Sequence, residues 1–193
     1  DISILPSTYG GISCDNQGNI LFPSGNKILK MNKTSLVIST VAGNGFSGHS
    51  CDGGLSTAAE IAPGFITVDK VGNIYIVETN KHFIRKVDVT TNIITTIAGT
   101  GYNDCIDGSA SNARIGSPRG IAIDTDGNIY FADHDCGKIR KIDATTKNSL
   151  IKTMSNYRKD FTPITDGIVD KWARKDMEIP QGYYYGFSPA TIK

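Results

Sequence analysis

Short apolar runs alternate with polar turns along the chain. The clearest copy has four such runs: GIAID (120–124), IYFAD (129–133), KIRKID (138–143) and SLIKTMS (149–155). Asp126-Gly127 separates the first two runs, which are rich in β-formers, and is a strong hairpin signal because glycine accepts the positive φ of tight turns. The pattern therefore predicts a unit of four antiparallel strands.

The same unit occurs three times. Its Gly-Asn-Ile motif falls at Gly18, Gly72 and Gly127, with spacings of 54 residues from 18 to 72 and 55 from 72 to 127. A constant period of this size indicates one repeated supersecondary unit. The first two runs of each copy are apolar almost throughout, whereas the third alternates apolar residues with Lys and Arg. Radial four-stranded units with packed inner strands and solvated outer strands make a β-propeller.

We therefore expect an all-β fold, a single partial β-propeller over residues 1–193. The predicted parts are blade 1 at about 6–41, blade 2 at about 63–97, blade 3 at about 118–155, and a divergent link with the start of blade 4 at about 156–193. The run YYYGF (183–187) is predicted to be the first strand of that fourth blade. Long Gly-rich links at 42–63 and 98–118 join the blades, and loops of this length are often functional.

Composition narrows the class of protein. Hydrophobic residues make up 39% of the 193 residues and charged residues 20%, which is typical of a soluble globular protein. No run of about 18 apolar residues occurs, so no membrane span is expected. A net charge of +1 makes nucleic acid an improbable partner.

Other features favour a secreted or cell-surface protein. The chain opens on Asp1 without an initiator Met, which suggests processing or a longer parent chain. Asn32-Lys33-Thr34 is a glycosylation sequon in a predicted turn, and we expect a glycan on Asn32. The four cysteines form no C-x-x-C pair, so a structural zinc site is not expected, and their even number favours disulfides.

Two stretches carry a family resemblance: PRGIAIDTDGNIYFADHDCGKIRKID (118–143) and PGFITVDKVGNIYIVETNKHFIRKVD (63–88). They resemble the NHL-repeat β-propellers, and the resemblance extends over about residues 6–155. Family members are typically six-bladed rings that serve as recognition platforms, so the resemblance implies a recognition role. A related minority of the family are metal-dependent enzymes.

The chain departs from the family pattern in two ways. Blade 1 has ILFPSGNKILKMN (20–32) where the family pattern would have an Asp and an Arg, and Pro23 suggests a disturbed second strand. Three blades and one further strand also fall short of a ring. An open arc exposes an apolar face at each end, so we expect further blades from elsewhere.

In this topology the links and the turns between second and third strands share one face, which family members use for binding. The candidates on it are Phe46, His49, Tyr102, Asn103, Asp104, His82, His134 and Asp135. The same topology puts Cys105 beside Cys136, and this is the favoured disulfide. Cys51–Cys105 is the rival pairing, and Cys14 is expected to be a buried small hydrophobe.

Two interpretations of polar residues remain. Asp133, His134 and His82 are the candidate metal ligands, but a surface turn explains Asp133 and His134 better, so we expect no metal and no cofactor. The Arg-Lys pairs at 85–86 and 140–141 are predicted to lie on a solvated outer strand, where their charges would protect against edge pairing.

The function expected is non-enzymatic recognition of a protein or glycan. One alternative is a structural subunit that joins copies of itself through open blade edges into a ring or filament. The other is a metal-dependent propeller lyase or hydrolase.

Overall fold

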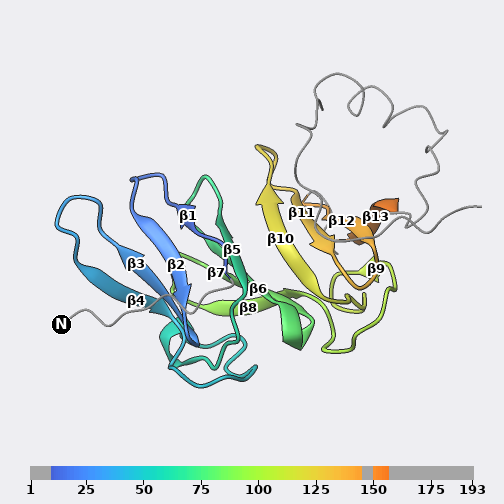
Figure 1. The fold of residues 1–193 in the computed structure, drawn as a ribbon, viewed down its shortest axis with the longest axis horizontal. Coiled ribbons are helices and arrows are strands. Elements are labelled where there is room, and N and C mark those ends of the chain that lie inside the picture. Colours follow the sequence, from blue (N-terminus) through green and yellow to red (C-terminus); the bar gives the residue numbers. More distant parts are fainter. Residues whose placement is uncertain (1–9, 145–149, 157–193) are drawn as a thin grey trace, which may run out of the picture. The chain divides into compact units, whose positions relative to one another are not determined.

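A computed structural model describes residues 10–144 and 150–156, which form three antiparallel sheets (Figure 1). The first sheet contains β1 (Ser13–Cys14), β2 (Ile20–Ser24), β3 (Lys27–Met31) and β4 (Ile38–Ala42). The second contains β5 (Phe65–Val68), β6 (Ile74–Glu78), β7 (Phe83–Val87) and β8 (Ile94–Ala98). The third contains β10 (Pro118–Ile123), β11 (Ile129–Asp133), β12 (Lys138–Ile142), β13 (Leu150–Asn156) and the short β9 (Gly108–Ser109). Two short 3-10 helices, η1 (Ser56–Ala58) and η2 (Thr79–Lys81), lie between strands.

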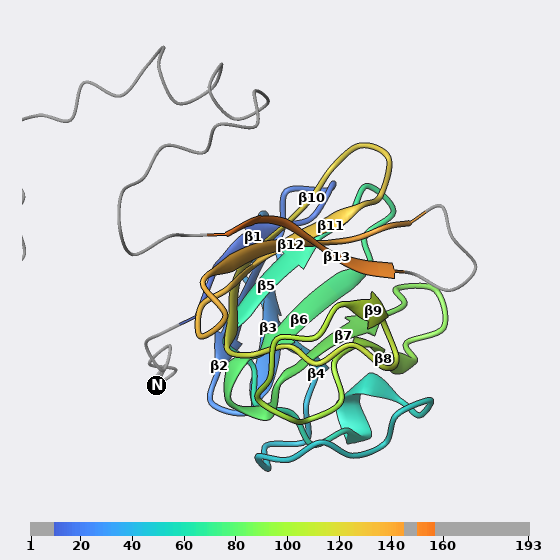
Figure 2. The ribbon, with the colours of Figure 1, turned by 90° about the vertical axis from the view of Figure 1, so that its right-hand side faces the viewer.

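In each sheet the four main strands pair in chain order, so the predicted four-stranded antiparallel unit is confirmed. The pattern of apolar runs did not predict β9, which lies in the second link and pairs with the outer strand β13 (Figure 2). It adds a fifth strand to the third sheet. The run 183–187, predicted to begin a fourth blade, lies outside the described residues.

An aspartate organises the turn after the first strand of every sheet. Its Oδ1 atom accepts the backbone N–H of the asparagine four positions later: Asn19 to Asp15 at 2.9 Å, Asn73 to Asp69 at 2.9 Å and Asn128 to Asp124 at 2.8 Å. The glycine between them has a positive φ in each copy, of 80° at Gly18, 107° at Gly72 and 86° at Gly127. These side chains satisfy turn N–H groups, which is why the Asp…Gly-Asn pattern recurs at the same place.

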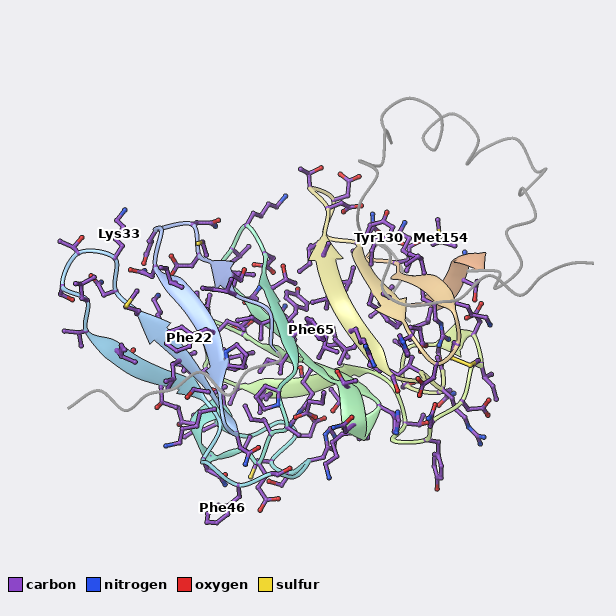
Figure 3. All side chains as sticks on the ribbon, viewed as in Figure 1. Phe22, Lys33, Phe46, Phe65, Tyr130 and Met154 are labelled. Atoms are coloured by element: carbon purple, nitrogen blue, oxygen red, sulfur yellow. A yellow bond between two sulfur atoms is a disulfide. The ribbon has the colours of Figure 1, made fainter. Side chains whose placement is uncertain are left out.

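The apolar faces of the sheets pack against one another in two clusters. Ile28, Ile61 and Ile76 belong to the cluster between the first and second sheets. Ile84 and Phe131 belong to the cluster between the second and third, against which Phe65 also packs (Figure 3). Both faces of the second sheet are therefore covered, and its strand β6 is buried along its whole length.

The predicted disturbance at Pro23 affects the neighbouring strand instead. Pro23 lies within a continuous β2 and is opposite Ile28 of β3. The pairing of Ser13 with Leu21 would place Gly11 opposite Pro23, but β1 contains only two residues. Because proline has no N–H to donate, it limits pairing on this side and the first strand is cut short.

Candidate functional site: the link face

The two long links and the turns between second and third strands lie at the same end of the sheets, the lower edge in Figure 1. We call this end the link face. Hydrogen bonds join its parts: Asn26 Nδ2, in the first sheet's turn, donates to the Gly45 carbonyl at 3.2 Å, and His82 Nδ1 contacts the Gly116 carbonyl. Each turn is thus tied to a link, as the propeller topology requires.

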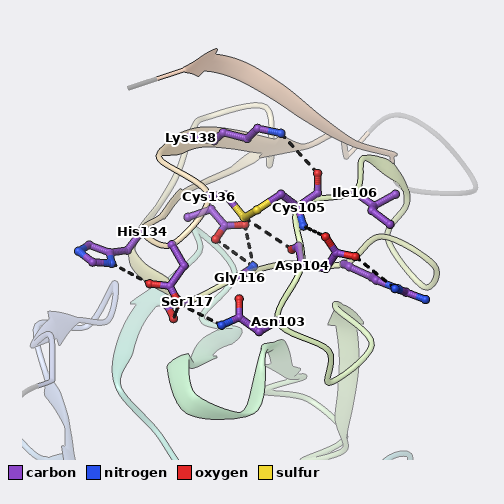
Figure 4. The surroundings of a disulfide bond; sticks show 12 residues. Asn103, Asp104, Cys105, Ile106, Gly116, Ser117, His134, Cys136 and Lys138 are labelled. Carbon is purple, nitrogen blue, oxygen red and sulfur yellow. Dashed lines mark hydrogen bonds and ion pairs between the residues drawn. A yellow bond between two sulfur atoms is a disulfide. The ribbon is translucent and has the colours of Figure 1, made fainter. Parts of the chain in front are cut away.

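A disulfide joins Cys105 of the second link to Cys136 of the β11–β12 turn, with their Cα atoms 5.6 Å apart (Figure 4). The favoured pairing is confirmed and the rival Cys51–Cys105 pairing is wrong, because Cys51 is a free, exposed thiol. The expectation that Cys14 is buried is also wrong. Cys14 lies on β1 and is exposed.

Beside the disulfide, Asp135 gathers three polar side chains (Figure 4). Its Oδ2 atom accepts hydrogen bonds from Ser117 Oγ and from Asn103 Nδ2, the latter at 3.1 Å, and its Oδ1 atom lies 3.0 Å from His134 Nδ1. These contacts, that of Ser117 first, lower the pKa of Asp135 to about 2. The structure therefore brings three of the candidate residues into one cluster, and Ser117 was missed because no motif marks it.

A second group on the same link surrounds Tyr102, which is 66% exposed. The guanidinium of Arg114 lies 5.3 Å from the centre of the Tyr102 ring, and its Nη1 atom is 3.2 Å from Asp104 Oδ2. The hydrogen bond from the backbone N–H of Cys105, and then this contact with Arg114, lower the pKa of Asp104. Tyr102 is thus an exposed ring in contact with the Arg114 guanidinium, which is itself paired with Asp104.

Phe46 occupies the equivalent place in the first link. The sequence Ala-Gly-x-Gly precedes both aromatic residues, at 42–45 and at 98–101. Phe46 is 69% exposed and lies at the link face (Figure 3). Each link therefore presents one exposed aromatic ring on this face.

His49, another candidate, is held in place by its contacts. Its ring stacks on Phe83 with centroids 3.7 Å apart, while Nδ1 lies 3.1 Å from Glu78 Oε2 and Nε2 lies 3.2 Å from Thr96 Oγ1. Glu78 is fully buried. His49 therefore fastens the first link to the second sheet.

The arginines of the repeated Arg-Lys pairs contradict the outer-strand prediction. Arg85 and Arg140 are fully buried, because β7 and β12 are interior strands with β8 and β13 outside them. Arg140 donates to Asp133 at 2.9 Å and to the link carbonyl of Ile106 at 2.8 Å. Arg85 donates likewise to the link carbonyl of Ser50 at 2.7 Å. Both side chains clamp a link onto a sheet.

The three candidate metal ligands contact other protein groups rather than one another. Asp133 is buried against Arg140 and the N–H of Gly116, His134 contacts Asp135, and His82 contacts the Gly116 carbonyl. Among residues 10–144 and 150–156, no three His, Cys, Asp or Glu side chains lie close enough together to hold a metal ion.

Asn32, the predicted glycan acceptor, lies in the β3–β4 turn at the opposite end of the first sheet (Figure 1). It is exposed, and its Oδ1 atom accepts the N–H groups of Thr34 and Ser35, both at 2.9 Å. This geometry leaves the link face unobstructed. Within the described part of the chain, no helix has the length and apolar character needed to cross a membrane.

Comparisons with known proteins match parts of the chain. The family model of the teneurin NHL domain matches residues 100–167. Identity is 38% over 72 residues with the chloroplastic protein SUPPRESSOR OF QUENCHING 1 of Arabidopsis thaliana, 38% over 106 with teneurin-1 of Gallus gallus, and 30% over 105 with NHL repeat-containing protein 2 of Homo sapiens. These matches cover 37%, 47% and 53% of this chain and only 7%, 4% and 14% of those proteins.

Solved structures share the fold. An auxiliary nutrient binding protein from Bacteroides thetaiotaomicron aligns with a TM-score of 0.54 at 21% identity, over 74% of this chain and 35% of that one. A gluconolactonase from Xanthomonas campestris aligns with a TM-score of 0.54 at 14% identity, over 76% and 47%. At these identities the likeness concerns the fold alone, and it confirms the β-propeller architecture.

Proposed function

Because the chain is an NHL-repeat β-propeller segment, we propose that it is a non-enzymatic recognition module that binds a protein or glycan ligand through its link face. The observation that carries the proposal is the pair of exposed rings, Phe46 and Tyr102, at matched positions of successive links. Aromatic rings supply large contact areas at low cost in side-chain entropy, and they are enriched at binding hot spots.

The scaffold under these rings supports the same proposal. The Cys105–Cys136 disulfide, the Asp135 cluster and the buried Arg140 all hold the second link against the sheet. A site whose loops are ordered before binding loses less entropy on association. Tyr102 is therefore displayed on a link that is already held in place.

We also propose a secreted or cell-surface location. Disulfides persist in oxidising compartments, and the exposed turn of Asn32 presents a glycosylation sequon away from the link face.

The test is a binding screen with immobilised extracellular proteins and glycans. The wild-type chain, the double variant Phe46→Ser/Tyr102→Ser, and the control Val37→Ser are applied in parallel. Val37 is also an exposed apolar residue, but it lies in the β3–β4 turn at the other end of the first sheet. We expect a ligand that the wild type and the control retain equally and that the double variant binds at least tenfold more weakly. Retention of every ligand by the double variant would disprove the proposal.

An assembly role is the second candidate. Ile12, which directly precedes β1 of the first sheet, and Ile139 of the third sheet are exposed on faces that no sheet of the described structure covers. Apolar faces of this kind favour association with further blades. The mass measurement described in the Discussion tests this role.

A further inference from the structure

A pocket of about 160 Å³ opens between the first and second sheets, at the end opposite the link face. Its mouth lies between the β1–β2 and β5–β6 turns, which stand side by side at the upper edge of Figure 1. The residues that matter for its chemistry are Asp15, Leu21, Lys30, Ile74, Val71 and Val87. The leucine, isoleucine and valine residues supply the apolar part of the lining. The rest of the lining is polar and comprises the Asp15 carboxylate, the Lys30 ammonium group and the amide residues Asn16, Gln17 and Asn92.

The pocket lies where the other repeats place a tyrosine ring. Strand pairing makes Leu21 the counterpart of Tyr75 and Tyr130, because the three residues are opposite Lys30, Lys86 and Lys141 respectively. Tyr75 fills the corresponding space between the second and third sheets and is buried in their shared cluster. Leucine lacks the aromatic ring and the hydroxyl group, so the first repeat leaves this space unfilled.

The partners of the missing ring are still present. In the second sheet, Tyr75 donates its hydroxyl to Asp69 Oδ2 at 3.1 Å, and Lys86 Nζ lies 5.8 Å from the centre of its ring. In the third sheet, Tyr130 makes the same contacts with Asp124 at 3.1 Å and with Lys141 at 5.9 Å. The recurring arrangement is thus an aspartate at the hydroxyl and a lysine over the ring.

In the first repeat the counterparts of this aspartate and lysine turn to each other. Lys30 Nζ lies 2.7 Å from Asp15 Oδ2, the oxygen atom that corresponds to the tyrosine acceptor. Burial raises the pKa of Asp15, but hydrogen bonds from Lys30 and Asn19 outweigh this effect and lower it to about 2. Asp15 is therefore ionised at neutral pH. Its Oδ2 atom also accepts a hydrogen bond from Asn19 Nδ2 at 2.9 Å, so a phenol hydroxyl would take the place of Lys30 there, as the Tyr75 hydroxyl does on Asp69 Oδ2.

The size of the pocket suits one ring. An engineered apolar protein cavity of roughly 150 Å³ binds benzene. Ile74 and Val87 line the pocket on the side of the second sheet, and their counterparts Ile129 and Ile142 pack in the same cluster as Tyr75. The wall that accepts a tyrosine ring in one interface is thus repeated in the other.

We propose that this pocket binds a phenol ring, with the hydroxyl on Asp15 and the ring beneath Lys30, in place of the tyrosine that the first repeat lacks. The ring can come from a free phenolic compound or from a tyrosine side chain of a peptide. The proposal is independent of the link face and of the function proposed for it.

The test is a titration of the wild-type chain with p-cresol, followed by NMR shifts of the methyl groups of Val71 and Val87. We expect saturable shifts with p-cresol and at least tenfold weaker binding of toluene, which lacks the hydroxyl. N-acetyl-tyrosinamide separates the two sources: saturable shifts assign the site to peptide tyrosine as well, and their absence restricts it to free phenols. No saturable shift with p-cresol, or equal affinity for toluene, would overturn the proposal.

Variants locate the binding. Leu21→Tyr restores the repeat consensus, fills the pocket, and should weaken p-cresol binding at least tenfold, while Val37→Tyr adds the same side chain at an exposed site outside the pocket and should leave it unchanged. Unaltered affinity in Leu21→Tyr would contradict the proposal. If that variant does not fold, Leu21→Phe fills the pocket without a buried hydroxyl and serves the same comparison.

Discussion

Arg140 shows how one residue position differs among the repeats. Its Nη1 atom lies 2.9 Å from Asp133 Oδ2, and both side chains are fully buried. The matched pair Arg85–Glu78 is looser, at 4.0 Å, with His49 as a second partner of the carboxylate. In the first sheet strand pairing puts Leu29 and Ser24 at these positions. The fold therefore accepts either an arginine–carboxylate pair or two uncharged residues at these two positions.

Removing only one charge should be costly. We expect Arg140→Leu to lower the free energy of unfolding by about 3–5 kcal/mol, because Asp133 would keep a buried, unpaired carboxylate. The double variant Asp133→Ser/Arg140→Leu reproduces the first repeat and should lose clearly less. Urea unfolding followed by circular dichroism measures both. A double variant as unstable as the single one would show that the charge itself is not the cause.

The second link depends on contacts with the third sheet. Cys105–Cys136 closes a loop of sequence separation 31, and β9 adds a short pairing with β13. Asp107 links the same segment to β13, since its Oδ2 atom accepts the N–H of Thr153 at 2.8 Å. The link is consequently an ordered part of the sheet rather than a free loop.

Loss of the disulfide should loosen this element. A loop of this size predicts a decrease of roughly 3–4 kcal/mol in unfolding free energy for Cys105→Ser/Cys136→Ser. Cys51→Ser is the matched control, because Cys51 is a free thiol of the first link. Thermal unfolding with and without reductant provides the measurement. If reductant destabilised the control and the double variant equally, the stabilisation would not come from this bond.

The three sheets leave one apolar face at each end without a covering sheet among the described residues. Ile66 of the second sheet is 5% exposed against the first sheet, but its counterpart Ile12 is 70% exposed. Ile84 is fully buried against the third sheet, but its counterpart Ile139 is 43% exposed. Equivalent isoleucines are thus buried in the second sheet and exposed in the first and third repeats.

These faces should cause self-association of the 193-residue chain. Light scattering with size-exclusion chromatography is expected to show a mass above 20.7 kDa that rises with concentration. Ile12→Glu/Ile139→Glu should shift the chain toward the monomer, since a charge on an apolar face opposes its burial. Val71→Glu places the same charge in an exposed turn and should change nothing. A monomer at every concentration would argue against assembly through these faces.

The sequence alone determined the local elements and their order. Gly-Asn-Ile after an aspartate specifies each hairpin turn through its own hydrogen bonds, so the strands around Gly72 and Gly127 could be predicted from neighbouring residues. The propeller topology inferred from the repeats then put Cys105 beside Cys136. The tertiary structure decided what each face buries. Arg85 and Leu21 look like an outer-strand charge and an ordinary apolar residue, yet one is a buried clamp and the other borders an unfilled pocket. Burial depends on the neighbouring sheet, whose residues are distant in sequence, and no local pattern encodes that contact.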